Sequence, residues 1–154
     1  MTGRSLSYIM NEPPISLQKK RILVREDLFK IPVSPDEKPR LIASKCSICG
    51  EVVFPKMKHC PNCCTDRVEE ILIGPGGKLY SFTVIYQPGP IGYKGPSPYG
   101  IVKIEMPEGL RIAGLSTVND PQKLHAGMDM ELVIDKLFDD QDGNEVIGFK
   151  FKPV

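Results

Sequence analysis

The amino-acid sequence predicts a mainly β chain, with an N-terminal helical segment, a small cysteine-rich ribbon and then a five-stranded barrel. Three observations carry this prediction. Two Cys-x-x-Cys pairs lie ten residues apart in the first half of the chain, strand patterns fill the second half, and a proline-bounded amphipathic stretch lies near the N-terminus. The 154 residues are enough for one ordinary domain or two very small ones. We expect three parts, covering residues 1–39, 40–67 and 68–154.

The first part is predicted to be a helical arm followed by a linker. Ser16 is a suitable helix cap, and the pattern that follows predicts a helix from Leu17 to Phe29 with basic residues around an apolar stripe. This helix would dock either on its own domain or, as a basic arm, on a partner protein or an acidic cofactor. Residues 31–39 contain three prolines and are predicted to form an extended linker.

The second part carries the most specific chemical pattern in the chain. Each Cys-x-x-Cys pair can form a tight knuckle, and two knuckles supply the four tetrahedral thiolates that a zinc ion prefers. Because four thiolates leave no open position for water, the site is expected to be structural. The predicted ligands are Cys46, Cys49, Cys60 and Cys63.

Two alternatives remain open at this site. Iron in a rubredoxin-like centre would also accept four thiolates, and ranks second to zinc. Cys64 adjoins the second pair and could replace Cys63 as a ligand, although the two-residue spacing favours Cys63. A nucleophilic role for Cys64 would need a base, and His59 is the one histidine near it in the sequence.

The third part has the pattern of a small Greek-key barrel. After a short strand at 68–73, five strands are predicted at 78–86, 99–106, 110–117, 130–138 and 145–151. A short helix is expected between the third and fourth of these, because Asn119-Asp120-Pro121 is a start signal and Gly127 a stop. The Asp142-Gly143 step predicts a hairpin between the last two. Five strands with this helix match an OB barrel better than a seven-stranded sandwich.

The loop between the first two barrel strands is a candidate binding site. Residues 87–98 contain four prolines and three glycines, and OB barrels commonly bind ligands through the loop in this position. Tyr93, Lys94 and Tyr99 offer aromatic faces and a cation there. An ordinary surface loop explains the segment equally well.

Charge and composition narrow the function classes. Residues 1–73 carry 12 Lys and Arg against 9 Asp and Glu, and residues 74–154 carry 8 against 10. Neither half has the positive excess of a protein that grips nucleic acid through phosphates. No apolar run is long enough to span a membrane and no signal peptide is recognisable, so we expect a cytoplasmic protein without a membrane partner.

The ordered motifs resemble one known family. Cys-x-x-Cys-Gly at 46–50, Phe-Pro-x-x-x-x-Cys-Pro-x-Cys at 54–63, Gly-x-x-Tyr-Ser-Phe-Thr-Val at 77–84 and Pro-Tyr-Gly-Ile-Val at 98–102 look like the acyl-CoA-associated zinc-ribbon and OB-fold proteins, catalogued as domain of unknown function thirty-five. The resemblance covers nearly the whole chain and is weakest over residues 1–30. Cys64 departs from it, because many members have glycine there.

The resemblance implies a role in lipid metabolism without a catalytic residue in the ribbon protein itself. Such proteins accompany thiolases, and in the archaeal mevalonate pathway the family member resembles a scaffold that joins thiolase to hydroxymethylglutaryl-CoA synthase around a shared coenzyme A site. We therefore expect a non-catalytic, zinc-stabilised scaffold that binds such enzymes and acyl-CoA, with Tyr93, Lys94 and Tyr99 as candidate CoA contacts.

Two other functions remain as alternatives. A single-stranded nucleic-acid-binding module would use stacking aromatics such as Tyr80, Phe82 and Tyr86, which alternate along one predicted strand and are expected to be core residues. An enzyme acting on acyl-CoA would use Cys64 and His59 as nucleophile and base. No other catalytic motif is present in the sequence.

Overall fold

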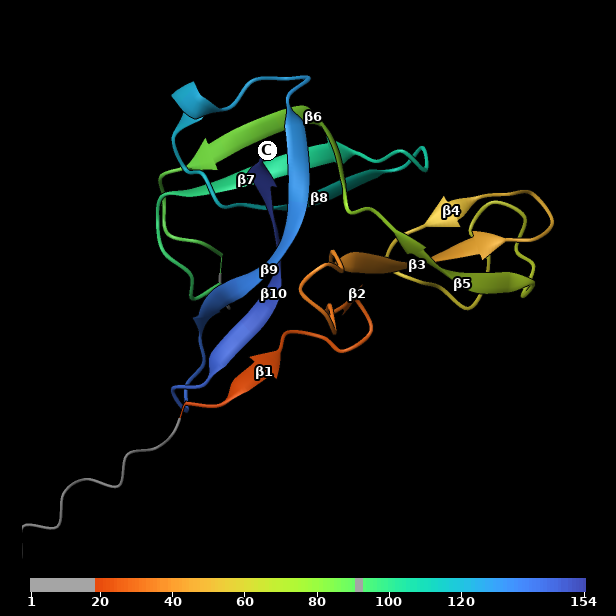
Figure 1. The fold of residues 1–154 in the computed structure, drawn as a ribbon, viewed down its shortest axis with the longest axis horizontal. Helices are drawn as coiled ribbons and strands as arrows, with labels where there is room; N and C mark the ends of the chain where they lie inside the picture. The colour runs from red at the N-terminus through yellow and green to blue at the C-terminus, as the bar shows by residue number, and fades with distance from the viewer. Residues whose placement is uncertain (1–18, 91–92) are drawn as a thin grey trace, which may run out of the picture.

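The computed structural model describes residues 19–90 and 93–154, which form ten β-strands and one turn of 3₁₀ helix (Figure 1). Among these residues, no helix is long and apolar enough to cross a membrane. The elements are β1 (Arg21–Leu23), β2 (Phe29–Lys30), β3 (Arg40–Cys46), β4 (Val52–Val53), β5 (Val68–Ile73), β6 (Gly76–Ile85), β7 (Tyr99–Glu105), β8 (Arg111–Ser116), η1 (Pro121–Lys123), β9 (Asp129–Asp139) and β10 (Glu145–Pro153).

The last five strands close into a barrel. β6 pairs with β7 and β7 with β8, both antiparallel, and β8 runs parallel to β10. β9 pairs with β10 along almost its whole length and with the first residues of β6, which joins the two ends of the sheet. With η1 between β8 and β9 in chain order, this is the strand order of an OB barrel, and the predicted five-stranded barrel is confirmed.

Two short connections of the barrel also follow the sequence prediction. The Asp120 carboxylate accepts a hydrogen bond from the N–H of Gln122 at 3.0 Å and caps η1, which is limited to one turn. Between β9 and β10, the Asp140 carboxylate accepts from the backbone N–H of Asn144 at 2.8 Å, and Gly143 has a positive φ of 79°. The acidic turn is therefore held by its own hydrogen bonds.

The helix predicted from Leu17 to Phe29 is wrong over the residues that the structure describes, and its first two residues lie outside them. β1 instead runs parallel to the start of β10, and the N–H of Val24 donates to the Ile147 carbonyl at 2.8 Å. β2 pairs with β3. Because these neighbouring strands satisfy the backbone groups that a helix would satisfy internally, tertiary pairing overrides the helical periodicity of the segment.

A second sheet forms the ribbon. β3 lies at its centre, with β2 and β4 paired to it over two residues each. β5 pairs with β3 over six residues, from Leu41 opposite Ile73 to Cys46 opposite Val68. The predicted strand at 68–73 is thus hydrogen-bonded to the ribbon, and the chain passes through Gly74-Pro75 directly into β6 (Figure 1).

The ribbon and the barrel share one apolar core. Leu41, Ala43 and Ile73 of the ribbon belong to the same buried cluster as the barrel residues Leu79, Ile104 and Phe151. Phe149 of β10 lies at the contact, because its ring meets Phe29 edge-on at 6.4 Å and Phe54 edge-on at 5.8 Å between ring centroids. The two parts therefore pack against each other directly.

A bulge in β6 changes which side chains face the core. Leu79 pairs with Ile104 and Ser81 with Lys103, so Tyr80 is an extra residue without a cross-strand partner. Both Tyr80 and Ser81 face outward, while Leu79 is buried and Phe82 packs against the core. The expectation that Tyr80 and Tyr86 are core residues is wrong, since their side chains are 47% and 68% exposed. For Tyr80, simple alternation fails because the bulge shifts the pattern by one residue. Tyr86 is exposed for a different reason, because β6 ends at Ile85 and Tyr86 begins the loop that follows.

Candidate metal centre and binding surfaces

The two cysteine pairs form a pair of matching knuckles. In the first, the Gly50 N–H donates to the Cys46 carbonyl at 3.0 Å, and in the second the Cys64 N–H donates to the Cys60 carbonyl at 2.9 Å. The first cysteine of each pair also donates its backbone N–H to the carbonyl of the residue five positions later. Cys46 donates to Glu51 at 2.8 Å, and Cys60 donates to Thr65 at 2.8 Å. These turns fix the backbone of each pair so that both sulfurs point to the same side.

The four sulfurs meet at one point. The Sγ atoms of Cys46 and Cys63 are 3.6 Å apart, those of Cys49 and Cys60 are 3.5 Å apart, and all four lie within 4.8 Å of one another. A tetrahedral ion with Zn–S bonds of about 2.3 Å needs sulfurs separated by about 3.8 Å. The cluster therefore fits a zinc ion without rearrangement of the chain.

The electrostatics of the cluster favour a bound cation. The backbone N–H of Glu51 lowers the pKa of Cys49 to about 6, against the effect of burial. At Cys63 the N–H of Thr65 acts in the same direction, but burial and the three neighbouring thiols outweigh it and raise the pKa to about 12. Four thiols this close cannot all ionise without a compensating charge, which a divalent metal supplies.

Cys64 occupies the position in the second knuckle that Gly50 occupies in the first. Gly50 has φ 77° and Cys64 φ 58°, and Cys64 is the one non-glycine residue with a positive φ among those described. The Cys64 side chain is exposed and its sulfur lies outside the four-sulfur cluster. The geometry thus brings Cys63, and not Cys64, to the other three thiols.

The other sequence-predicted chemistry is not assembled. His59 and Cys64 are both exposed, and no hydrogen bond joins their side chains in the described part of the chain. The nucleophile and base considered for an acyl-CoA enzyme are therefore not arranged as a pair.

The loop residues expected to contact CoA lie close together, but they differ in exposure. The rings of Tyr93 and Tyr99 pack against each other at an interplanar angle of 37°, with 4.6 Å between their centroids, and the Tyr93 hydroxyl donates to the Pro96 carbonyl at 3.2 Å. Tyr99 is only 8% exposed, Tyr93 is half-buried and Lys94 is exposed. Of the three, Lys94 is the most available to a ligand, while Tyr99 positions Tyr93.

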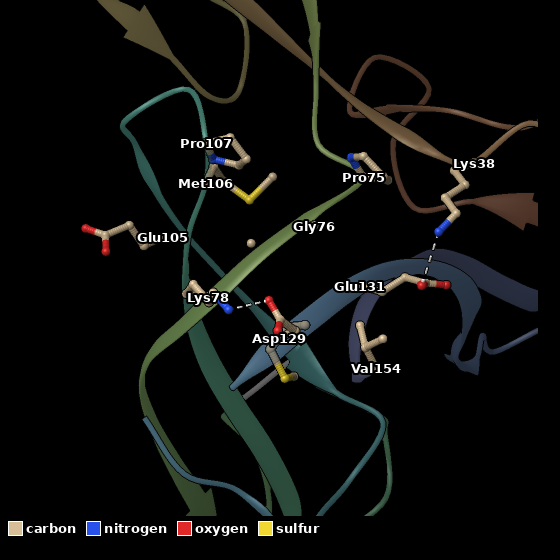
Figure 2. A pocket seen from close by; sticks show the side chains of 12 residues that line it. Lys38, Pro75, Gly76, Lys78, Glu105, Met106, Pro107, Asp129, Glu131 and Val154 are labelled. Atoms are coloured by element: carbon tan, nitrogen blue, oxygen red, sulfur yellow. Dashed lines mark ion pairs between the residues drawn. The ribbon is translucent and has the colours of Figure 1, made fainter. Parts of the chain in front are cut away.

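A groove that sequence reasoning missed lies where the ribbon joins the barrel (Figure 2). Its volume is about 630 Å³, and its floor includes Gly76, Gly77, Met106 and Pro107. A Cβ atom at Gly76 would meet the Met130 carbonyl, so the crossing strands require glycine here. Glycines at the start of a strand are a sequence signal for such a close backbone approach.

Charged side chains border this groove, and they are paired. Lys78 lies 2.7 Å from the Asp129 carboxylate, and Lys38 lies 3.5 Å from that of Glu131 (Figure 2). Glu105 also lines the groove and pairs with Arg111, so each of these charged side chains has a partner, while the rest of the lining is mostly apolar. This combination is typical of small-molecule sites, which are apolar with a few polar groups.

Comparison with known proteins identifies the family. Residues 36–69 match the family model described as ChsH2, rubredoxin-like zinc ribbon domain, and residues 70–135 match ChsH2, C-terminal OB-fold domain. A DUF35 domain-containing scaffold protein of Pyrococcus furiosus is 34% identical over 77% of this chain and 86% of its own length. The chain belongs to the DUF35 family. The resemblance seen in its sequence motifs is confirmed.

Two further proteins are similar to this chain. The benzoylsuccinyl-CoA thiolase subunit BbsA of Thauera aromatica is 32% identical over 83% of this chain and 85% of its own length. Among solved structures, a chain of the Ltp2-ChsH2(DUF35) aldolase aligns with a TM-score of 0.58 and 24% identity, over 74% of this chain and 84% of that one. The structural likeness supports the fold of ribbon and barrel.

Proposed function

We propose that this DUF35 protein is a non-catalytic scaffold subunit that binds a thiolase-type condensing enzyme and contributes to the binding of its acyl-CoA. The observation that carries the proposal is the similarity of most of the chain both to proteins named scaffolds and to a protein named as a thiolase subunit. The site geometry agrees with it, because the four-thiol cluster is closed and His59 and Cys64 are not paired.

In this proposal one zinc ion is held by Cys46, Cys49, Cys60 and Cys63 and acts structurally. The ion ties two knuckles to each other and so fixes the ribbon, which has few buried side chains of its own. The division into residues 1–39, 40–67 and 68–154 remains part of the proposal as a division along the chain, with the ribbon sheet extending beyond residues 40–67 through β2 and β5.

Two places on the chain are proposed to meet the acyl-CoA. Lys94, beside Tyr93, would contact an anionic phosphate of the CoA moiety, because its ammonium group is exposed. The groove between ribbon and barrel, lined by Gly76, Met106 and Pro107 and called the junction groove below, would accommodate an apolar chain. Its volume of about 630 Å³ lies within the range of small-molecule sites. A charge reversal at Lys94 and a groove-filling substitution of Pro107 would tell these two places apart in a titration with CoA and with a medium-chain acyl-CoA.

The fuller form of the proposal places hydroxymethylglutaryl-CoA synthase on the same scaffold as the thiolase. A cavity shared by the two enzymes would let the condensation product reach the second active site without release. Removal of that product would draw an unfavourable condensation forward. This form connects the chain to the mevalonate pathway and to lipid metabolism.

Exposure of Tyr80 and Tyr86 is the observation that favours the nucleic-acid alternative. The ring of Tyr80, however, is covered by the Arg111 guanidinium, whose carbon lies 3.6 Å from the ring centroid. Arg111 is in turn paired with Glu105 at 3.0 Å, and a carboxylate here repels phosphate. The scaffold proposal therefore ranks first.

The proposal is tested by co-expression of the tagged full chain with a thiolase from the same genome. We expect a stable complex on size-exclusion chromatography, and thiolase activity that depends on the scaffold. The isolated chain should not hydrolyse or condense acyl-CoA. An acyl-CoA dehydrogenase from the same genome serves as the control partner and should elute separately. Recovery of the thiolase free of this chain, with unchanged activity, would refute the proposal.

A further inference from the structure

The bulge in β6 builds a preorganised aromatic–cation pair on the outer surface of the barrel. Tyr80, turned outward by the bulge, lies under the Arg111 guanidinium at 3.6 Å, and Arg111 is also held by the Glu105 carboxylate at 3.0 Å. The three residues come from β6, β8 and β7, three adjacent strands of the barrel. Each side chain is thus already restrained by another, which reduces the entropy lost when a partner covers them.

A hollow lies on the same three strands. It has a volume of about 280 Å³ and is lined on its outer side by the short side chains of Ser81, Thr83 and Ala113. Ser81 is opposite Lys103, and Lys103 is opposite Ala113, so these residues form one row across the sheet. A cavity of about 150 Å³ is enough for a benzene molecule. The hollow, which we call the barrel-face groove, therefore has room for one large apolar side chain.

One charged side chain on this surface, that of Lys103, has no ion-pair partner among the described residues. Lys103 lines the groove and is exposed, and in the described part of the chain no carboxylate lies within ion-pair distance of it. The junction groove differs, because Lys38 and Lys78 on its rim each have a carboxylate partner (Figure 2). A partner segment that placed a carboxylate against Lys103 would therefore form an ion pair and bind more tightly or more specifically.

We propose that the barrel-face groove is a docking site for the thiolase-type partner, and that it takes a segment presenting a large apolar side chain next to a carboxylate. The inference rests on the proposed function and adds the surface and the chemistry of the contact. The apolar side chain fills the space above Ser81, Thr83 and Ala113, and the carboxylate pairs with Lys103. Tyr80 and Arg111 lie at the border of this contact. Tyrosine and arginine are among the residue types that most often contribute large binding energies in protein interfaces.

A protein segment fits this surface better than a nucleic acid. A strand of nucleic acid requires several cations along a track, whereas here Arg111 is neutralised by Glu105 and Lys103 remains the one unmatched charge among the groove-lining residues. The covered ring of Tyr80 is also less available for stacking with a base.

The test measures the affinity of the full chain for the thiolase by isothermal titration calorimetry. Ala113→Arg fills the groove with a long side chain and should weaken binding by about 30-fold or more, as loss of an interface hot spot does. Ala113→Ser keeps a short side chain and should bind within about twofold of the wild type. Because Ala113 is exposed, both variants should melt at nearly the wild-type temperature.

The charge is tested separately. Lys103→Glu should weaken binding by about tenfold or more, and Lys103→Met should flatten the dependence of affinity on salt. Lys123→Glu is the matched control, since Lys123 is also an exposed lysine of the barrel part, has no ion-pair partner among the described residues and lines neither groove. It should bind as the wild type does. If Ala113→Arg fails to fold, the Lys103 variants still decide the question.

The outcomes separate the inference from the proposed function. If the wild type binds the thiolase and the Ala113→Arg and Lys103→Glu variants bind equally well, the docking site is overturned while the scaffold function stands. If the wild type binds no thiolase, both are overturned. The site assignment also falls if these substitutions instead abolish a self-association seen by sedimentation velocity, or the binding of a single-stranded thymidine 20-mer measured by fluorescence anisotropy.

Discussion

The ribbon and the barrel are both β-structure, but different forces hold them. In the barrel, strands of 6 to 11 residues close on themselves, and their inner faces supply the fully buried Leu79, Val102, Ile104 and Phe151. In the ribbon, β2 and β4 have two residues each, and two of its most buried side chains are the thiols of Cys46 and Cys60. A unit of this size cannot bury enough apolar surface to be stable alone, so metal ligation replaces part of a core.

The comparison predicts that loss of a metal ligand acts on one part of the molecule first. Cys60→Ser should abolish stoichiometric zinc binding, because structural zinc binding contributes about 10–16 kcal/mol in small zinc-dependent units. Hydrogen exchange measured by mass spectrometry should then show loss of protection in β3, β4 and β5, with the amides of β9 and β10 still protected. Cys64→Ser is the control, and should retain both the zinc and the protection. Equal loss of protection in ribbon and barrel would show that the two are one cooperative unit.

Phe149 connects the two parts, so its removal tests how much the ribbon depends on the barrel. Phe149→Ala should lower the free energy of unfolding by about 3 kcal/mol, because the ring loses its contacts with Phe29 and Phe54 and leaves a cavity. Urea denaturation would measure the change. Tyr86→Ala, at a side chain that is 68% exposed, should change the same quantity by less than about 0.5 kcal/mol. Similar values for the two variants would mean that the ribbon does not draw stability from the barrel.

The backbone of Gly74, where the ribbon joins the barrel, is hydrogen-bonded on both sides. The Arg40 guanidinium, from the ribbon, donates to the Gly74 carbonyl, and the Glu108 carboxylate, from the turn after β7, accepts from the Gly74 N–H at 3.1 Å. Glu108→Ala should therefore cost about 1–3 kcal/mol of stability, as expected when a partly buried hydrogen-bonding group loses its partner. Chemical denaturation measures it, with Glu69→Ala on the exposed part of β5 as the control. A cost no greater than that of Glu69→Ala would show that the junction is not fixed by this contact.

The smallest expected change in stability comes from substitutions at the equivalent positions of the two knuckles, Gly50 and Cys64. Cys64 adopts a left-handed conformation that costs a non-glycine residue about 1–2 kcal/mol, whereas Gly50 adopts it freely in the equivalent turn. In the zinc-loaded protein, Cys64→Gly should raise the melting temperature, and Gly50→Ala should lower it by a comparable amount. Because no atom lies within 4 Å of a Cβ built at Gly50, the effect there comes from the backbone alone. Shifts of the same sign would contradict the equivalence of the two turns.

Much of the barrel was predictable because its signals are local. The alternation in β7 and β8, the Asp142-Gly143 turn and the Asp120 cap each act within a few residues of the sequence. The bulge was not predictable in this way, because it depends on which residue of β7 stands opposite Leu79. For that reason the outward orientation of Tyr80, and the barrel-face groove beside it, emerged only from the cross-strand register.

By itself, the sequence determined the cysteine spacing that draws four sulfurs together, the order of the barrel strands and the family to which the chain belongs. These features depend on short-range geometry and on motifs that persist along the chain. The tertiary structure alone decided that residues 21–30 add strands to β10 and β3, that Cys64 stands outside the sulfur cluster, and that a groove forms where the ribbon joins the barrel. The added strands and the groove depend on hydrogen bonds and packing between segments far apart in the chain, and no local pattern specifies them. For Cys64, the two-residue spacing favoured Cys63 as the ligand, and the tertiary structure closed the alternative.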